Sequence, residues 1–394
     1  MKAKLIGSVA LVATLSACAD TATIARVSES RAGFAAVADR SRNAQTGTPG
    51  WHQNAAEIAA AEARSKAMLQ GKTISAETAV QVALLNNRGL QASYADLGLS
   101  AADVWEAALG PVPSFGVSVS GLAGDVARTL EATLITSILE AATAKPRTKV
   151  AELRFQQAQL AAAGDTVSLA VETRRAWIET VAAFEAASLI ARTQNTANAA
   201  SELAVELGRT GAMNAADQAR EHAFTAEIAA ERADAKLEAQ LAKERLARLM
   251  GVSLGQVTFF VPDALPGLPG RPRSRTDIER LALQNRVDIA AGRLELQAIA
   301  ADYRLTGETR AVSDVAIRAG LEAERDAGET ETTPVVEVEF EIPIYDTGRL
   351  VSRRGNLEYL KAANLLADAA TSARAEARAA HLEVTGKHGV ARHW

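Results

Sequence analysis

The residues ALLNNRGL at 83–90 and ALQNRVDI at 282–289 match each other at an offset of 199. Residues 153–155 match residues 357–359 in the same way, at an offset of 204. Around each member of these pairs, the apolar pattern predicts a helix, two short strands and a long helix, in that order. Such an internal duplication predicts two copies of one structural unit within the chain.

Each copy contains two short segments in which apolar residues alternate with polar or small ones. In the first copy the segments are 114–120 and 130–138, and Pro146 is expected to close the second. In the second copy they lie near 315–323 and 335–344. A period of two predicts strands whose two faces differ in character.

The last of these segments has the clearest difference between its faces. Glu337, Glu339 and Glu341 alternate with the apolar residues Val336, Val338, Phe340 and Ile342. A water-filled lumen suits carboxylates, and lipid suits the apolar side chains. The pattern therefore favours a membrane strand with the three glutamates toward a pore over an ordinary half-buried sheet.

The longest element is a predicted helix from 147 to 209, a stretch without proline. At about 63 residues it would be roughly 95 Å long, which predicts a coiled coil or a helical tube and not a globular core. Gly208 and Gly211 are expected to end it, and a second helix is predicted at 214–250.

Composition excludes several classes of protein. The chain has 394 residues, a net charge of −4 and no basic patch, so nucleic acid is not an expected partner. No apolar run after the first 20 residues is long enough for a transmembrane helix, so crossing a membrane would require strands. Its single cysteine excludes an intrachain disulfide and a cysteine metal cluster.

That cysteine follows a short apolar stretch at 5–15, at the end of the residues LSAC at 15–18. The pattern predicts a secretory signal peptide at 1–17. Its end resembles the lipobox of bacterial lipoproteins, in which the cysteine, here Cys18, carries the lipid. Ala19 follows where an aspartate would resemble an inner-membrane retention signal, so the resemblance implies the outer membrane. The alternative is an ordinary signal peptide with a chance cysteine.

The predicted domain plan places one boundary at each change of pattern. Ser75 is expected to cap a helix that runs to Gly110, and residues 21–71 are expected to form an arm with one helix. The segments are the signal peptide 1–17, the arm 18–74, the first repeat 75–250, a Pro/Gly-rich connector 251–275, the second repeat 276–384 and an unpatterned tail 385–394.

The duplication, the strand pairs and the lipobox together resemble TolC-family outer-membrane factors, over about residues 75–383. Residues 346–349, DTGR, are similar to the family's strand-to-helix junction. Residues 209–217, RTGAMNAAD, resemble its periplasmic tip, where a glycine and a downstream aspartate flank an αα turn. Here Ala212 replaces the leucine usual in the family.

The resemblance implies a mainly α fold with a small β part. Long antiparallel coiled-coil helices would form a periplasmic tunnel, and four strands per chain would join a twelve-stranded barrel in a homotrimer. It also implies an outer-membrane, lipid-anchored conduit that works with a periplasmic adaptor and an inner-membrane pump, in efflux or type I secretion. The adaptor would contact the tip through Arg209, Gly211, Ala212 and Asp217. Gly211, Asn214 and Asp217 also have a structural explanation, which is a turn at Gly211 and a helix cap at Asn214 with Asp217.

No catalytic arrangement stands out, the five histidines lack metal-ligand spacing, and no cofactor is expected beyond the lipid on Cys18. The alternative function is a lipid-anchored periplasmic coiled-coil scaffold without a pore. Such a scaffold would not explain four alternating segments placed symmetrically in a duplication. The exported cargo cannot be inferred from the sequence.

The repeat offset also predicts that the chain is incomplete. The first long helix turns at Gly211, and the equivalent turn would fall at about position 415, beyond Trp394. A long helix without its returning partner is expected to expose apolar surface. Weak trimerisation and poor transport are therefore expected.

Overall fold

The computed structural model describes residues 19–43, 47–121, 128–268, 275–309, 315–326, 329–340 and 348–392. The expected signal peptide, Cys18, Glu341 and the start of the DTGR segment lie outside these ranges. The chain divides into two compact units. The first comprises Met1–Gly33, Asp96–Ala161 and Arg273–Leu382, and the second comprises Phe34–Ala95, Ala162–Pro272 and Glu383–Trp394.

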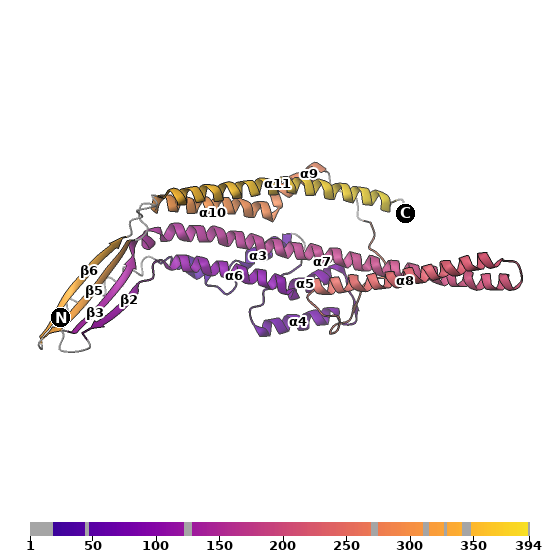
Figure 1. The fold of residues 1–394 in the computed structure, drawn as a ribbon, viewed down its shortest axis with the longest axis horizontal. Coiled ribbons are helices and arrows are strands. Elements are labelled where there is room, and N and C mark those ends of the chain that lie inside the picture. The colour runs from indigo at the N-terminus through magenta and orange to yellow at the C-terminus, as the bar shows by residue number, and fades with distance from the viewer. Residues whose placement is uncertain are drawn as a thin grey trace. The chain divides into compact units, whose positions relative to one another are not determined.

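The duplication is present in the order of the elements (Figure 1). The first copy consists of α5 (Ala76–Asn86), α6 (Arg88–Leu109), β2 (Ser114–Ser120), β3 (Arg128–Ser137) and α7 (Ile138–Arg209). The second copy consists of α9 (Arg275–Asn285), α10 (Val287–Thr309), β5 (Val315–Asp326), β6 (Glu329–Phe340) and α11 (Arg349–Ala391). α5 and α9 begin and end at positions separated by the predicted offset, which confirms the internal repeat.

The single helix predicted from Ser75 to Gly110 is two helices, α5 and α6. Ser75 caps α5 as predicted, because its side chain accepts a hydrogen bond from the Thr78 backbone N–H. The break comes at Asn87, whose backbone is extended and whose Oδ1 accepts from the Leu90 N–H at 3.0 Å. Its Nδ2 donates to the Leu249 carbonyl, so the residue ends one helix through its backbone, and its side chain starts the next helix and ties it to a third.

The described part of the N-terminal arm contains three helices, not one: α2 (Thr21–Val27), α3 (Phe34–Asn43) and α4 (Ala55–Leu69). The sequence signals that the prediction missed are helix N-caps within a polar stretch of the chain. The Asp20 carboxylate accepts from the Thr23 N–H at the start of α2, and Asn54 accepts from the Glu57 N–H at the start of α4. Such caps stabilise helices whose apolar pattern is weak.

The four strands form one antiparallel sheet in the order β2-β3-β5-β6. The prediction that Pro146 closes the second strand is wrong, because β3 ends at Ser137 and Pro146 lies inside α7. The Ser137 hydroxyl accepts from the Glu140 N–H and so caps the start of this helix. A proline removes one backbone hydrogen bond from a helix. A helix of 72 residues tolerates this loss, because its other hydrogen bonds remain.

In the second unit, the part of α7 from Ala162 to Arg209 and α8 (Ala215–Leu249) form a helical hairpin (Figure 1), in which α8 matches the predicted 214–250 closely. The connector after α8 contains β4 (Phe259–Phe260), which pairs in parallel with β1 (Lys72–Thr73). This small sheet was not predicted, because two-residue strands have no readable period. Trp177 of α7 is buried there, and its indole N–H donates to the Ile74 carbonyl at 3.0 Å.

The tail predicted to be unpatterned from residue 385 is helical, since α11 extends to Ala391. A Lys387–Glu383 ion pair one turn apart supports this end. Gly386 and Gly389 lack neighbours that a side chain would meet, so they weaken the helix without marking its end. None of the helices in the described ranges combines the length and apolarity needed to span a bilayer.

Candidate functional site

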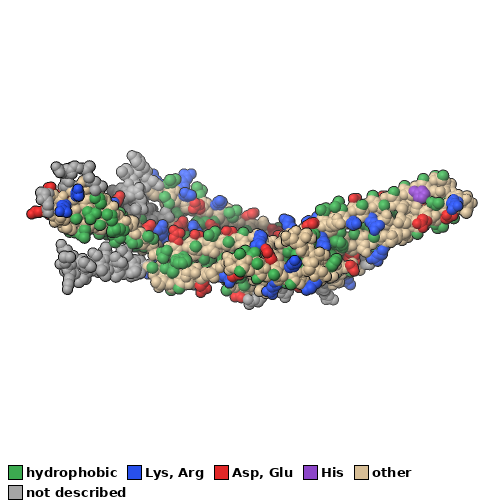
Figure 2. Space-filling view, turned by 90° about the horizontal axis from the view of Figure 1, so that it is seen from below, with side chains coloured by type: hydrophobic (Ala, Val, Ile, Leu, Met, Phe, Trp, Pro, Cys, Tyr) green, Lys and Arg blue, Asp and Glu red, His purple; other side chains and the backbone are tan. Residues whose placement is uncertain are grey.

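The strand register gives the sheet one apolar face. Paired residues in an antiparallel sheet lie on the same face, and here Val117 pairs with Ala132, Ala132 with Leu321 and Leu321 with Pro334. Neighbouring rows extend this face through Phe115, Val119, Leu130, Leu134, Ile317, Ala319, Val336 and Val338, and its end row carries Arg128 and Arg325. Hydrophobic side chains gather over these strands at the left of Figure 2. Several of them are exposed, which is unusual for a soluble sheet.

The opposite face of the sheet is polar and acidic. The register places on it the carboxylates of Glu131, Glu322, Glu324, Asp326, Glu329, Glu331, Glu337 and Glu339. Arg318 is the only cation that the described strands place on this face. Its guanidinium lies 3.6 Å from the Glu337 carboxylate, and the Ser118 hydroxyl donates to Glu131 at 3.1 Å.

This face contains both described members of the glutamate set predicted from the sequence. Glu337 and Glu339 share it, whereas Glu341 lies outside the described residues. Sequence reasoning missed Arg318 and the acidic residues of β3 and β5. In β3 and β5 apolar and polar residues alternate only irregularly. The residues of these strands share a face with the glutamates of β6 only because of the way the strands pair.

The hairpin tip is built by a helix C-cap followed directly by a helix N-cap. At the end of α7 the Ala212 N–H donates to the Leu207 carbonyl at 2.8 Å and the Gly211 N–H donates to the Gly208 carbonyl at 3.1 Å. This pair of bonds is the Schellman motif, and Gly211 has the positive φ, 75°, that the motif requires. Asn214 then caps α8 by accepting from the Asp217 N–H at 2.9 Å.

All four predicted tip residues therefore lie in or beside one short turn. Arg209 and Ala212 are exposed, and Arg209 pairs with Glu206 at 3.0 Å. Asp217 accepts from the Asn214 side chain and pairs with Arg220 at 3.2 Å. The structural explanation of Gly211, Asn214 and Asp217 thus accounts for the local geometry, and Arg209 and Ala212 remain available at the surface.

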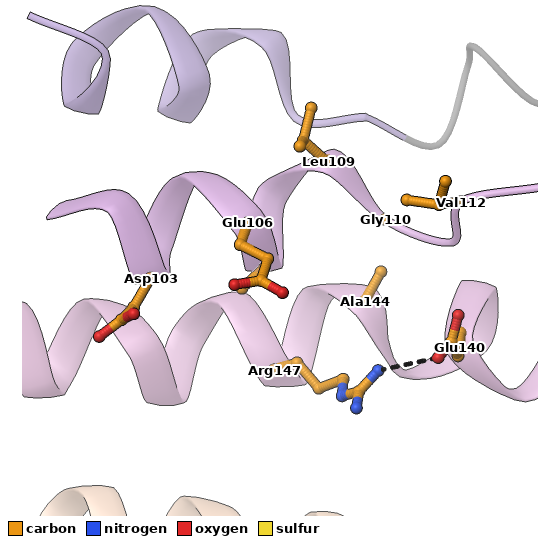
Figure 3. A pocket seen from close by; sticks show the side chains of 9 residues that line it. Asp103, Glu106, Leu109, Gly110, Val112, Glu140, Ala144 and Arg147 are labelled. Carbon is orange, nitrogen blue, oxygen red and sulfur yellow. Dashed lines mark ion pairs between the residues drawn. The ribbon is translucent and has the colours of Figure 1, made fainter. Parts of the chain in front are cut away.

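A charged groove of about 510 Å³ lies between the end of α6 and the start of α7, within the first unit (Figure 3). Asp103 and Glu106 line it from α6, and Glu140 and Arg147 form a loose ion pair at 3.8 Å on α7.

Among the described residues, no group of three or more His, Cys, Asp or Glu side chains could hold a metal ion.

The clearest pKa shifts belong to groups that hold helices together. Arg286, at the break between α9 and α10, hydrogen-bonds to Asp288 and Glu376. The hydrogen bond from Arg286 lowers the pKa of Asp288. Burial raises the pKa of Tyr94 in α6 to about 12, and its hydroxyl lies 2.8 Å from that of Thr166 in α7. Both groups take part in contacts that join helices, since Arg286 connects Asp288 of α10 with Glu376 of α11 and Tyr94 of α6 meets Thr166 of α7.

The N-terminal end of the described chain is fixed close to the sheet. The Asp20 N–H donates to the Ala108 carbonyl at 3.0 Å, near the end of α6, and Arg26 pairs with Glu152 at 2.6 Å. Strand β2 begins at Ser114, only a few residues after Ala108. Cys18 itself is outside the described residues, but Asp20 follows it by two positions.

No family model and no curated protein sequence matches the chain. Solved structures do match it. CusC aligns with a TM-score of 0.57 and 17% identity, over 78% of this chain and 73% of that one. The MtrE outer membrane channel of Neisseria gonorrhoeae aligns with a TM-score of 0.60 and 15% identity, over 79% of this chain and 72% of that one.

The Campylobacter jejuni CmeC outer membrane channel gives a TM-score of 0.56 at 17% identity, over 79% of this chain and 68% of that one. The chain has the fold of these outer-membrane channels. The outer-membrane channel fold expected from the sequence, long helices with a small antiparallel sheet, is confirmed. At this level of identity the fold is what the similarity establishes.

Proposed function

We propose that the chain is one protomer of a passive outer-membrane channel that serves a tripartite efflux or type I secretion system. The observation that carries the proposal is the sheet with one apolar face and one acidic face, in a chain with an outer-membrane channel fold. Lipid would contact the apolar face and water the acidic one. A coiled-coil scaffold without a pore gives no reason for this division.

The proposed assembly is a homotrimer with a twelve-stranded barrel. Strands β2 and β6 are the two edges of the sheet, and an edge in hydrocarbon would leave backbone N–H and C=O groups without hydrogen bonds. Pairing the β2 edge of one copy with the β6 edge of the next would close the sheet. No catalytic role and no cofactor are part of the proposal.

The acidic face is expected to make the channel prefer cations. Changing Glu337, Glu339 and Glu341 to glutamine should lower the cation preference severalfold, because fixed carboxylates in a pore raise the local cation concentration. Reversal potentials in planar bilayers with a salt gradient give the preference. The Arg318→Gln variant is the opposite control and should raise it. An unchanged preference in both variants would count against a lumenal location of this face.

We further propose a lipid on Cys18 that anchors the N-terminus in the outer membrane. The hydrogen bond between Asp20 and Ala108 supports it, because it holds the chain near the start of β2, where an acyl chain would reach the bilayer. The Cys18→Ala variant should lose all incorporation of a fatty-acid analogue, since no other cysteine is present. Ser16→Ala is the matched control. Equal labelling of Cys18→Ala would disprove the anchor.

The proposed partners are a periplasmic adaptor at the hairpin tip and an inner-membrane pump. Arg209→Glu should weaken adaptor binding roughly tenfold or more, because a like-charge contact at an interface costs several kcal/mol. Binding of a purified periplasmic adaptor and co-purification of the chain with that adaptor from cells both measure this effect. Arg192→Glu, an exposed charge on the same helix, should leave both unchanged. Equal behaviour of the two variants would remove Arg209 from the contact.

A further inference from the structure

The two copies of the repeat differ in what covers their first helix. In the first copy, residues 47–52 of the arm lie along α5. The Gln81 side chain accepts from the Thr48 N–H at 3.0 Å and donates to the Thr48 carbonyl at 2.8 Å. The His52 ring meets the Leu85 carbonyl at 3.1 Å, and Leu84 is fully buried. A loop segment of the chain itself therefore closes this face of α5.

The equivalent face in the second copy is an open groove. The offset of 199 that relates α5 to α9 places Arg280 at the position of Gln81 and Leu283 at the position of Leu84. α9 and α11 border a groove of about 460 Å³ at these residues, within the first unit. Leu283 is only half-buried there. The groove thus corresponds to a surface that the first copy covers.

The contact between the first helix and the long helix is the same in both copies. Arg174 of α7 lies 3.7 Å from Glu77 of α5. Arg378 of α11, which follows Arg174 by the offset of 204, lies 3.7 Å from Glu279 of α9. Since the two helix pairs are built alike, the second copy differs from the first in its cover and in its charges.

The groove has an excess of positive charge. Its described lining includes three cations and one anion, which are Arg280, Arg374, Arg378 and Glu279. Arg374 forms no ion pair or hydrogen bond with another described residue. Arg280 has only long contacts, at 3.6 Å to Asp277 and at 3.4 Å to Gln284. Both guanidinium groups therefore retain donors for an anionic partner.

Arginine in place of glutamine changes which segment fits. The Gln81 amide pairs with both the N–H and the C=O of Thr48, whereas a guanidinium has donors and no acceptor. The arm of another molecule of this chain would leave its Thr48 N–H unpaired at Arg280, and residues 47–52 contain no carboxylate. Carboxylates, by contrast, pair with guanidinium groups through two parallel hydrogen bonds.

We propose that the groove between α9 and α11 binds an acidic peptide segment of a partner protein. Carboxylates of the segment would pair with Arg280 and Arg374, and an apolar side chain would cover Leu283. Clusters of arginine that bind acidic motifs are a common mode of peptide recognition. The proposal concerns the helices alone and does not depend on whether the sheet forms a channel.

Fluorescence anisotropy with three labelled peptides tests the groove. The full chain in detergent is titrated onto residues 47–53 as a synthetic peptide, onto the same peptide with Thr48→Glu and His52→Glu, and onto a third with Thr48→Lys and His52→Lys. The acidic peptide should bind roughly tenfold more tightly than the unmodified one, because it gains two exposed ion pairs. The lysine peptide should bind more weakly than either.

Variants of the chain locate the binding. Arg280→Gln restores the residue type of the first copy, so it should bring the acidic and unmodified peptides to within about fivefold of each other. Arg374→Glu should weaken binding of the acidic peptide roughly tenfold, because it places a like charge in the groove. Arg293→Gln, which changes an exposed arginine of α10 outside the groove lining, should alter neither result.

Three outcomes would overturn the proposal. Equal binding of the acidic and unmodified peptides by the native chain would show that charge does not select the occupant, and would favour the arm of a neighbouring molecule. Binding of the acidic peptide that Arg280→Gln and Arg374→Glu leave unchanged would place the peptide elsewhere on the chain. No measurable binding of the acidic peptide would show that the groove does not take such a segment.

Discussion

Arginine in place of Val336 is expected to abolish assembly of the chain in membranes. Val336 lies on the apolar face of β6, is 73% exposed and pairs with Ala319 of β5. On the lipid face of a membrane barrel, arginine near the bilayer midplane costs about 2–4 kcal/mol, roughly a thirtyfold to several-hundredfold loss of the assembled form. Folding into lipid vesicles, followed by protease protection and gel mobility, measures this loss.

The control for this substitution is the adjacent valine. Val335 lies on the polar face of the same strand, opposite Gly320 of β5. Arginine there should be tolerated, because it would lie beside carboxylates and water and not in lipid. A similar loss of assembly for Val335→Arg and Val336→Arg would mean that the two faces of the sheet do not meet different environments, and the membrane assignment would be wrong.

Trp177→Ala is expected to cause the largest loss of stability in the second unit. The Trp177 side chain is 6% exposed and packs in a core with Leu69, Val82, Leu246 and Phe259, and its indole N–H holds the Ile74 carbonyl next to β1. Truncating a buried aromatic residue to alanine costs about 3–5 kcal/mol. Denaturant unfolding in detergent, followed by circular dichroism, gives the change in free energy.

Ile178→Ala provides the comparison, because Ile178 is the next residue of α7 but is 41% exposed. This substitution should cost less than about 1 kcal/mol, since little buried surface is removed. If the two variants lost equal stability, the α7 face that carries Trp177 would not be the one packed against the core of the second unit.

The parts of the fold that were predictable are those with a long or repeated pattern. The offset between α5 and α9, the hairpin of α7 and α8, and the alternation in β6 each persist over many residues, so the period is readable. Pro146 misled the prediction because a proline is not expected inside a helix, and the length of α7 compensates for it. The helices of the arm were missed because their caps, at Asp20 and Asn54, lie outside any strong apolar period.

The candidate sites divide in the same way. The turn at Gly211 follows from local chain geometry, since a positive φ and two caps are encoded within nine residues. The acidic face of the sheet does not follow from local chain geometry, because Arg318 and Glu337 meet only once β5 and β6 have paired in one register. Single-strand alternation predicted which glutamates share a face, and only the sheet shows what opposes them.

The measurement that tests the central claim most directly is the conductance of the purified chain in planar lipid bilayers. If the sheet forms a membrane channel, the native chain should give stepwise, cation-selective currents, and Val336→Arg should give none at the same protein concentration. Native protein that is folded, trimeric and bound to the bilayer, yet produces no current above that of Val336→Arg, would contradict the channel and favour a scaffold without a pore.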